Sequence, residues 1–186
     1  ILLQNIGGIG NMTVLPAAAR PEEVYAFDTG PGNMIVDAVV SALTGGAQTY
    51  DADGALAAGG TVCPELLQRL QADSYYRQPL PKTTGRERFG TQYTETILQW
   101  AEEHKLSGPD LAATVTDLTA WSIADAYERY VLPRYAAQEL IAGGGGSYNR
   151  TLLRFLTDRM AAHGVAVRTR RTWAGAATPR RRWPLL

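Results

Sequence analysis

The first third of the chain contains short apolar runs that alternate with polar or glycine-rich segments. Runs of this kind occupy residues 1–6, 12–15 and 24–27, and turn residues separate them. Short apolar runs bounded by turn residues are typical of strands. The pattern therefore predicts three successive strands arranged as a meander.

Residues 34–43 follow a different period. Ile35, Val39 and Leu43 recur every four residues and so lie on one side of a helix. Asn33 is a common N-cap residue, because its side chain can accept a hydrogen bond from the first helical turn. We expect a helix over residues 34–43 that is capped by Asn33 and ends at the glycine pair that follows.

The rest of the chain alternates between helical and strand-like segments. Residues 47–108 contain several prolines and a polar stretch, so we interpret them as a looser insertion between core elements. Apolar residues at helical spacing predict one helix over residues 110 to about 131 and another over residues 148–162. Asp110 is the expected cap of the first of these helices. Short apolar runs predict strands over residues 139–142 and 165–167.

This order of elements predicts an α/β fold. Three strands, a helix, an insertion and then helix, strand, helix and strand give a mixed sheet with antiparallel edge strands and flanking helices. In open α/β sheets, ligands bind beyond the carboxyl ends of the strands. We expect a functional site at that end of the sheet.

Three glycine-rich runs, at residues 5–11, 27–33 and 143–149, follow predicted strands. Glycine lets backbone amides approach an anion closely, and a helix N-terminus adds partial positive charge. Glycine is also the usual residue of any tight turn, so one such run alone indicates only a loop. Neither the Walker pattern nor the dinucleotide fingerprint fits, but three runs in succession predict a cradle for nucleotide phosphates.

Composition narrows the class of protein. The 186 residues include 45% hydrophobic and 19% charged residues, as is ordinary for a soluble globular protein, and 18 basic residues balance 18 acidic ones. This balance argues against nucleic acid or an anionic membrane as a partner. No stretch resembles a membrane span or a signal peptide. Cys63 is the single cysteine and no zinc-ligand spacing occurs, so we expect a small, partly buried thiol in a cytoplasmic protein.

Three further motifs, taken with the glycine-rich turns, resemble one family. They are Asn33-Met-Ile-Val-Asp37, Lys82-Thr-Thr-Gly-Arg-Glu-Arg-Phe89 and Asp117-Leu-Thr-Ala120. With these motifs in this order, the chain resembles the anhydro-N-acetylmuramic acid kinases from about Leu2 to Val167. That family belongs to the sugar-kinase and actin superfamily.

The resemblance implies a ribonuclease-H-like (actin-like ATPase) fold. Residues 1–167 correspond to the C-terminal domain of a two-domain sugar kinase whose N-terminal domain is absent here, with an insertion at about residues 47–108. The implied enzyme is an ATP-dependent carbohydrate kinase with ATP and Mg²⁺ as cofactors. It hydrolyses the anhydro ring of 1,6-anhydro-N-acetylmuramic acid and phosphorylates the sugar to N-acetylmuramic acid 6-phosphate in cell-wall recycling. Full-length members are expected to be homodimers.

The resemblance also implies which residues contact the nucleotide. The turn after the first strand corresponds to the second phosphate loop, the second glycine-rich run to a central turn near the metal and phosphates, and the third run to an adenosine-side loop. The implied nucleotide- and phosphate-binding residues are Gly7, Gly8, Gly10, Asn11, Asp28, Thr29, Gly30, Gly32, Asn33, Gly144, Gly145, Gly146 and Asn149.

Four charged residues have both a functional and a structural interpretation. Asp28 is the candidate Mg²⁺ ligand, directly or through water, and the alternative is an Asx-turn within its own loop. Arg86 and Glu87 are candidates for contact with the sugar or for closing the cleft, and the alternative is an ion pair within the chain. Asp37 faces the cleft or caps a buried network. The family's general-base aspartate lies upstream of this chain, so we assign no catalytic residue and expect weak ATP binding without turnover.

Two departures from the family pattern are visible. Gly10 stands where the family commonly has alanine, and we interpret this as a mild change in a turn. Residues 168–186 are basic, lack a helical period and are expected to be disordered. We interpret them as a shifted reading frame, with a basic nucleic-acid-binding tail as the alternative. The alternative for the whole chain is a non-catalytic nucleotide-binding or dimerisation module.

Overall fold

The structure is a computed structural model that describes residues 1–175, and it contains a five-stranded sheet. The strands are β1 Leu2–Ile6, β2 Ile9–Val14, β3 Tyr25–Pro31, β4 Glu139–Gly143 and β5 Ala166–Thr169. They lie in the order β3-β2-β1-β4-β5. The first three are antiparallel neighbours, whereas β4 and β5 run parallel to β1. The predicted mixed sheet, with antiparallel strands toward one edge, is confirmed.

Helices make up most of the remaining described chain. The α-helices are α1 Met34–Leu43, α2 Ala55–Ala58, α3 Pro64–Gln71, α4 Arg86–Phe89, α5 Thr91–Glu103, α6 Gly108–Tyr130, α7 Arg150–Ala161 and α8 Arg170–Gly175. Short 3-10 helices are η1 Pro21–Glu23, η2 Ala52–Gly54, η3 Ser74–Arg77 and η4 Gly145–Tyr148. No helix within residues 1–175 has both the length and the hydrophobicity needed to cross a membrane.

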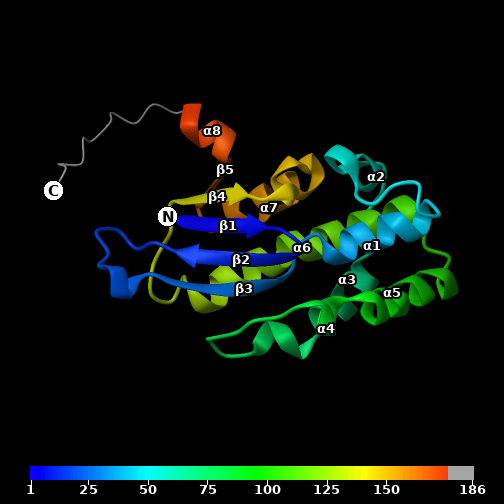
Figure 1. The fold of residues 1–186 in the computed structure, drawn as a ribbon, viewed down its shortest axis with the longest axis horizontal. Coiled ribbons are helices and arrows are strands. Elements are labelled where there is room, and N and C mark those ends of the chain that lie inside the picture. Colours follow the sequence, from blue (N-terminus) through cyan, green and yellow to red (C-terminus); the bar gives the residue numbers. More distant parts are fainter. Residues whose placement is uncertain (176–186) are drawn as a thin grey trace.

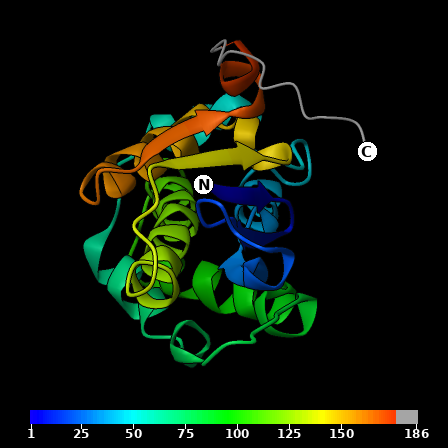
Figure 2. The same cartoon turned by 90° about the vertical axis from the view of Figure 1, so that its left-hand side faces the viewer.

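Helix α6 connects the two halves of the molecule. In Figure 1 it runs behind the strands and continues into a group of helices that includes α1, α3 and α5. Figure 2, seen from the side, places α8 beyond β5 at the edge of the sheet. α6 and α7 pack on each other and against one face of the sheet. The fold is therefore a sheet with helices on one face, extended by a helical half.

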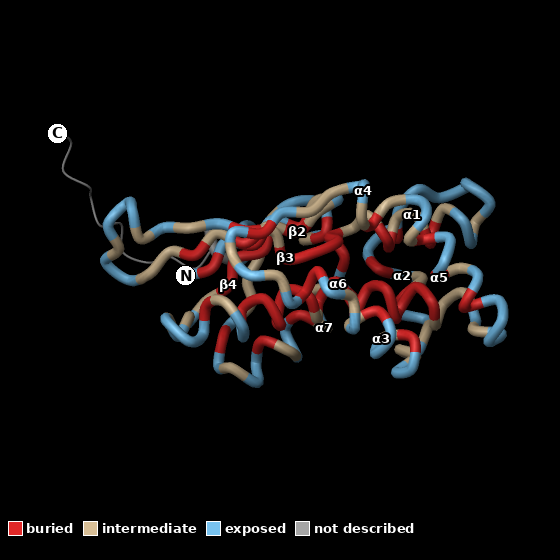
Figure 3. The backbone as a smooth tube through the Cα atoms, turned by 90° about the horizontal axis from the view of Figure 1, so that it is seen from below, coloured by how far each residue is buried: buried red, intermediate tan, exposed pale blue. Residues whose placement is uncertain are grey.

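Two hydrophobic clusters meet along α6, and Figure 3 shows buried positions continuous along this helix. One cluster joins Leu2, Phe27 and Leu140 of the sheet to Tyr127 and Leu156. The other joins α1, α3, α4 and α5 to the first half of α6. The sequence predicts an amphipathic helix here, but α6 is buried on nearly all sides because it has a neighbour on each.

Several element boundaries differ from the sequence prediction for local reasons. β2 and β3 are longer than expected, so Gly10, Asn11 and Asp28 lie in strands rather than in turns. Ser107, not Asp110, caps α6: its hydroxyl accepts the Asp110 N–H at 3.2 Å, and the helix starts two residues early. The Asp110 carboxylate instead accepts the N–H of Thr61 at 2.6 Å, which ties α6 to the preceding loop.

Two expectations about loose segments are wrong. Residues 47–108 are largely helical, and Leu66 and Phe89 within them are fully buried in the second cluster. Regular structure does not end at Val167, because β5 continues to Thr169 and α8 follows. Arg168 of β5 forms an ion pair with Glu139 of β4 at 2.7 Å. The rest of the predicted tail, residues 176–186, lies outside the described residues.

Candidate nucleotide site

The three glycine-rich turns meet at one end of the sheet. β1, β3 and β4 run in the same direction, since β3 is antiparallel to β2 and β2 to β1. The turns follow the carboxyl ends of these three strands. This is the position at which open α/β sheets bind ligands.

Backbone hydrogen bonds lock the first turn to the second. The N–H of Asn33 donates to the carbonyl of Gly7 at 2.7 Å, and the N–H of Met34 donates to that of Gly8 at 3.2 Å. Gly32 lies so close that an added Cβ would be 3.1 Å from the Gly10 nitrogen and would overlap the Gly7 carbonyl oxygen. Only glycine allows this approach, because a methyl group would push the two turns apart.

The third turn packs on the end of β1. Gly144 has φ +79°, and a Cβ there would lie 2.6 Å from the carbonyl oxygen of Ile6. Gly146 also faces Ile6, and a Cβ on it would lie 2.9 Å from Oδ1 of Asn33. Asn33 makes no side-chain capping bond to α1, so that prediction is wrong. Its side chain instead lies against the third turn.

Asn149 has a structural partner in the chain. Its Oδ1 accepts the N–H of Leu152 at 2.9 Å, which makes it the N-cap of α7. The helix therefore begins at Arg150 rather than at the predicted Tyr148. The side-chain oxygen of Asn149 holds the third turn at the start of a helix, where backbone N–H groups and the helix dipole favour an anion.

The Asp117-Leu-Thr-Ala120 motif supports two of the turns from α6. The hydroxyl of Thr119 donates to the carbonyl of Gly32 at 2.7 Å, and the carbonyl of Pro31 is 3.1 Å away. Asp117 is buried and accepts two hydrogen bonds from Arg159 of α7 at 2.9 and 2.6 Å. Sequence reasoning found the motif but not these contacts, because their partners lie 42 to 88 residues away.

Asp28 binds a loop that is distant in the sequence. It is the cross-strand neighbour of Asn11, whose Nδ2 donates to Oδ1 at 3.0 Å. Oδ2 accepts the hydroxyl of Thr83 at 2.7 Å and the N–H of Thr84 at 3.0 Å. The predicted alternative, an Asx-turn within its own loop, is therefore wrong. The carboxylate connects the sheet to residues 82–89.

The donor set limits how a metal ion could be held. No three His, Cys, Asp or Glu side chains within the described chain gather as a metal site. Asp28 already accepts three hydrogen bonds, and a carboxylate offers about four lone-pair sites. Mg²⁺ commonly keeps several waters and takes most other ligands from substrate phosphates. The residues present fit a Mg²⁺ ion held by Asp28 through water rather than within a protein cage.

Thr29 and Gly30 lie apart from the convergence of the turns. Thr29 is fully buried and accepts a hydrogen bond from Gln4 Nε2 at 3.3 Å, on the sheet face that packs on α6. A Cβ on Gly10 would lie 2.6 Å from the hydroxyl of Thr29. Gly10 therefore lies in a strand with little space for a Cβ, and the expectation that it lies in a turn is wrong. Gly30 faces Tyr76 and Ser122 of the core.

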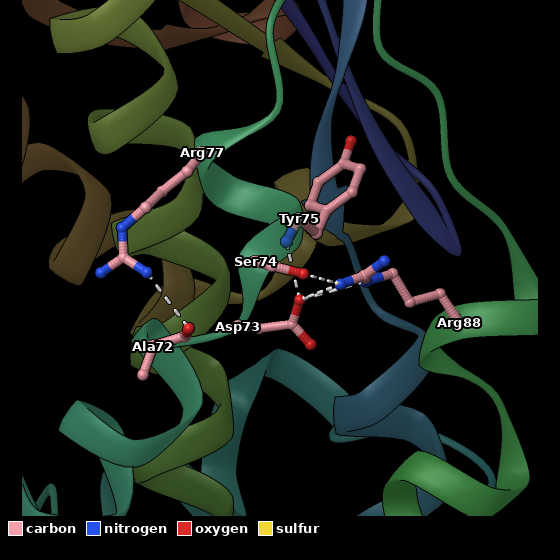
Figure 4. Close-up of polar contacts among 6 residues, drawn as sticks. All are labelled: Ala72, Asp73, Ser74, Tyr75, Arg77 and Arg88. Atoms are coloured by element: carbon pink, nitrogen blue, oxygen red, sulfur yellow. Dashed lines mark hydrogen bonds and ion pairs between the residues drawn. The ribbon is translucent and has the colours of Figure 1, made fainter.

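Both ends of the segment with Arg86 and Glu87 are anchored. One end is held by the hydrogen bonds of Thr83 and Thr84 to Asp28. At the other end, Arg88 forms an ion pair with Asp73 and donates a hydrogen bond to Ser74 Oγ at 2.8 Å, as Figure 4 shows. Arg86 and Glu87 between them are exposed. None of the ion pairs found among the described residues joins these two, so the predicted alternative of an ion pair is not observed.

Asp37 lies beside the third turn. It is half-buried on α1 and lines a small cavity with Asn33, Gly145, Gly146 and Tyr148. Burial raises the pKa of this carboxyl to about 6. The interpretation of Asp37 as a residue that faces the substrate cleft stays a prediction.

Tyr148 also lines a larger cavity of about 600 Å³. It is lined by Gly144, Ser147 and Arg150 from the third turn and the start of α7, and by Arg170 of α8. Its lining combines the arginine side chains with the apolar surfaces of Tyr148 and Leu153, and sequence reasoning did not include α8 in it.

The sheet order, the helices on one face and the turns at its carboxyl end define an α/β domain of the ribonuclease-H-like, actin-like ATPase class. Two solved structures share this fold. An activator of 2-hydroxyisocaproyl-CoA dehydratase from Clostridium difficile, with bound ADPNP, has a TM-score of 0.54 and 12% identity over 90% of this chain and 53% of its own. Component A of (R)-2-hydroxyglutaryl-CoA dehydratase from Acidaminococcus fermentans has a TM-score of 0.51 and 15% identity, over 90% and 54% of the two chains.

The family is shown by sequence comparison. The family model for anhydro-N-acetylmuramic acid kinase matches residues 1–176, so the chain belongs to that family, and the match extends past the predicted limit at Val167. Curated relatives of that name are 46% identical in Caldanaerobacter subterraneus, 47% in Salinibacter ruber and 42% in Bacillus anthracis. The alignments cover 86%, 84% and 89% of this chain, and 40%, 39% and 42% of those relatives. The chain thus spans about 40% of the length of these relatives.

Proposed function

We propose that this chain is the ATP-binding part of a kinase that hydrolyses the anhydro ring of 1,6-anhydro-N-acetylmuramic acid and phosphorylates it to N-acetylmuramic acid 6-phosphate. The observation that supports this most strongly is the convergence of three glycine-rich turns at the carboxyl ends of β1, β3 and β4. Family membership supplies the substrate class. We place the enzyme in the cytoplasm, in cell-wall recycling, as a homodimer of the longer protein.

In this proposal the nucleotide lies across the three turns. Its phosphates contact the backbone of Gly7 and Gly8 and the N-terminal end of α1, which the helix dipole makes favourable for an anion. The adenosine lies against Gly144–Gly146, in the cavity beside Tyr148 and Arg150. Asp37 faces the same turn from α1.

Asp28 is the residue of this chain that would hold Mg²⁺, through water. The ion would neutralise charge on the phosphate oxygens during phosphoryl transfer. Asn11 orients the Asp28 carboxylate through the hydrogen bond to Oδ1. Thr83 and Thr84 occupy Oδ2, so the same carboxylate keeps residues 85–87 near the phosphate end of the site.

Arg86 and Glu87 are proposed to contact the sugar or the domain that closes over it. Their exposure between two anchored ends supports this role. The reaction adds water to the anhydro bridge while the γ-phosphoryl group passes to the oxygen that is released, and the water requires a general base. We assign that base to the upstream part of the longer protein. This chain alone is therefore expected to bind ATP weakly and not to catalyse the reaction.

Calorimetry with ATP and Mg²⁺ tests the nucleotide site. We expect weak binding to the natural sequence, a loss of at least tenfold in Gly32→Ala, where the first two turns are forced apart, and no loss in the control Gly59→Ala. Thermal melting of both variants separates lost binding from lost folding. Absence of ATP binding to a folded natural chain would contradict the proposal.

A coupled assay with the anhydro sugar tests the chemistry. The longer protein is expected to convert the anhydro sugar, whereas this chain alone is not. Turnover by this chain would show that the general base lies within it. ATP binding without turnover by the longer protein would favour a non-catalytic nucleotide-binding module.

A further inference from the structure

Asp53 of η2 has a backbone conformation that suits glycine better. Its φ is +56°, in the left-handed region, which aspartate tolerates at a higher cost than glycine does. The other two residues within 1–175 that share this feature, Ala18 and Lys105, line neither of the cavities beside the third glycine-rich turn, whereas Asp53 lines both. The backbone therefore gives no reason for a carboxylate at position 53.

Neighbouring residues hold the Asp53 loop against the start of α7. The hydroxyl of Thr151 donates to the carbonyl of Gly54 at 2.7 Å, and a Cβ on Gly54 would lie 2.9 Å from the backbone nitrogen of Thr151. The Asp51 carboxylate accepts the N–H of Leu56 at 2.8 Å. The position of Asp53 beside the third turn is thus fixed by contacts that its own side chain does not make.

Asp53 and Tyr148 belong to the lining that the two cavities share. One is the small cavity that Asp37 also lines, and the other is the cavity of about 600 Å³ that Arg150 also lines. Asp53 is exposed and takes part in none of the ion pairs found within residues 1–175. Tyr148 is 64% exposed, and aromatic rings of this kind stack on nucleobases. An acceptor and an aromatic ring therefore lie together at the nucleoside end of the proposed site.

The chemistry of a carboxylate selects one part of a nucleotide. An ionised carboxylate only accepts hydrogen bonds. Phosphate oxygens are acceptors of like charge, so a carboxylate repels them. Ribose presents two adjacent hydroxyl donors, which match the two oxygens of one carboxylate, and an acidic residue binds the ribose in this way in dinucleotide-binding folds. The ribose is therefore the part of the nucleotide that fits Asp53.

We propose that the Asp53 carboxylate accepts hydrogen bonds from the 2′- and 3′-hydroxyl groups of the bound nucleotide and makes the site selective for ribonucleotides. This rests on the proposed function, because it requires the nucleoside to lie in the cavity beside Tyr148 and Arg150. Residues 47–108 then contribute a specificity-determining side chain to the nucleotide site.

The proposal predicts a sign that charge alone does not. A carboxylate near a triphosphate repels it, so removal of an Asp53 that made no contact would tighten ATP binding. Hydrogen bonds to a charged group are stronger than those between neutral groups. If Asp53 holds the ribose, its removal weakens ATP binding instead.

Amide chemical-shift titration of this 186-residue chain tests the proposal. The ligands are ATP and 2′,3′-dideoxyATP, each with Mg²⁺, and the second lacks only the two hydroxyl groups. The reporters are the amides of Gly7 and Gly8, which lie on another turn. We expect the natural chain to bind the dideoxy nucleotide roughly tenfold more weakly than ATP. Asp53→Gly, which suits the left-handed backbone, should bind both nucleotides equally and ATP roughly tenfold more weakly than the natural chain does.

Ala18→Gly is the matched control, because it places glycine at another left-handed position, with φ +53°, and changes no charge. It should bind both nucleotides as the natural chain does. Thermal melting shows whether Asp53→Gly is folded. If it is not, Asp53→Asn, which keeps the side-chain shape without the charge, takes its place and should reduce the preference for ATP.

Equal binding of ATP and the dideoxy nucleotide by the natural chain would overturn the inference and leave the nucleotide site standing. A preference for ATP that persists unchanged in the Asp53 variant, or tighter ATP binding by that variant, would overturn it as well. Failure of the folded natural chain to bind ATP would overturn the proposed function and this inference together, so the two failures are distinguishable.

Discussion

Single contacts between the strands behind the turns leave little space for larger side chains. Gly10 of β2 illustrates this, because a Cβ on it would lie 2.6 Å from the hydroxyl of Thr29. The register of β2 and β3 shifts at this point: Gly10 pairs with Gly30 and Asn11 with Asp28, which leaves Thr29 without a cross-strand partner. The bulge turns Thr29 into the core and leaves Asp28 beside Asn11.

The contact between Gly10 and Thr29 makes a coupled prediction. Gly10→Ala is expected to destabilise the chain by about 1–3 kcal/mol, because the methyl group meets the threonine hydroxyl. Thr29→Ala removes that hydroxyl, so the double variant should be more stable than the sum of the two single changes predicts, by about 1 kcal/mol. Urea unfolding of the four proteins measures this coupling. Strict additivity would show that the added methyl group is accommodated without the threonine hydroxyl having to move.

Asp37 makes a prediction about pH. Its pKa is about 6 in the folded chain, above its ordinary value, so the folded state binds more protons between pH 4 and 6. This group therefore favours folding at low pH, and its contribution is lost as pH rises through 6. Asp37→Asn removes this pH-dependent contribution to stability. The stability difference between the variant and the natural chain should grow by about 1–3 kcal/mol from pH 4 to pH 7 in favour of the variant.

Unfolding titrations at pH 4, 5, 6 and 7 test the role of Asp37, with Asp53→Asn as the control at an exposed position of η2. A difference between Asp37→Asn and the natural chain that does not change with pH would contradict the raised pKa.

At the scale of elements, α6 organises the site. It holds the central turn through Thr119 and α7 through Asp117, and α7 follows directly from the third turn. The turns are thus placed by a helix that contacts no ligand in our proposal. Substitutions in α6 are expected to alter the site by displacing the central turn and α7.

The pair of Asp117 and Arg159 is the sharpest test of this support. Side-chain exposure is 8% for Asp117 and 29% for Arg159. Asp117→Ala should destabilise the chain by about 2–4 kcal/mol, because it leaves the guanidinium partly buried without a partner. The double variant Asp117→Leu with Arg159→Met replaces both charged side chains with apolar ones. It should destabilise the chain less than Asp117→Ala does. Urea unfolding compares them, and a double variant no better than Asp117→Ala would contradict a penalty caused by the unpaired charge.

How far the sequence predicts an element depends on how local its determinants are. The bounds of α1 were predicted correctly, since four-residue spacing and the glycines that follow define it. The partners of Asp28 could not be predicted, because Thr83 and Thr84 lie 55 and 56 residues away and have no sequence pattern that links them to it. Ser107 was missed as the cap of α6 because Asp110, three residues later, is an equally common cap by type, and no cap was predicted for α7, which Asn149 caps.

At the scale of the molecule, the sequence predicts the fold class and the family, and the structure adds the connection between the site and the helical half. Residues 47–108 could not be recognised as packed structure, because most of their helices are short and bury their apolar faces mainly against one another and against α1 and α6. Through Asp28 this region reaches the sheet, so Asp28 and the segment with the exposed Arg86 and Glu87 belong to one connected unit.

The most direct test of the account is amide chemical-shift mapping of this chain with a nonhydrolysable ATP analogue and Mg²⁺. The account predicts that the amides of Gly7, Gly8, Gly32 and Gly144–Gly146 shift together and titrate with a single dissociation constant. Shifts confined to one turn, or different dissociation constants at different turns, would contradict a shared nucleotide site.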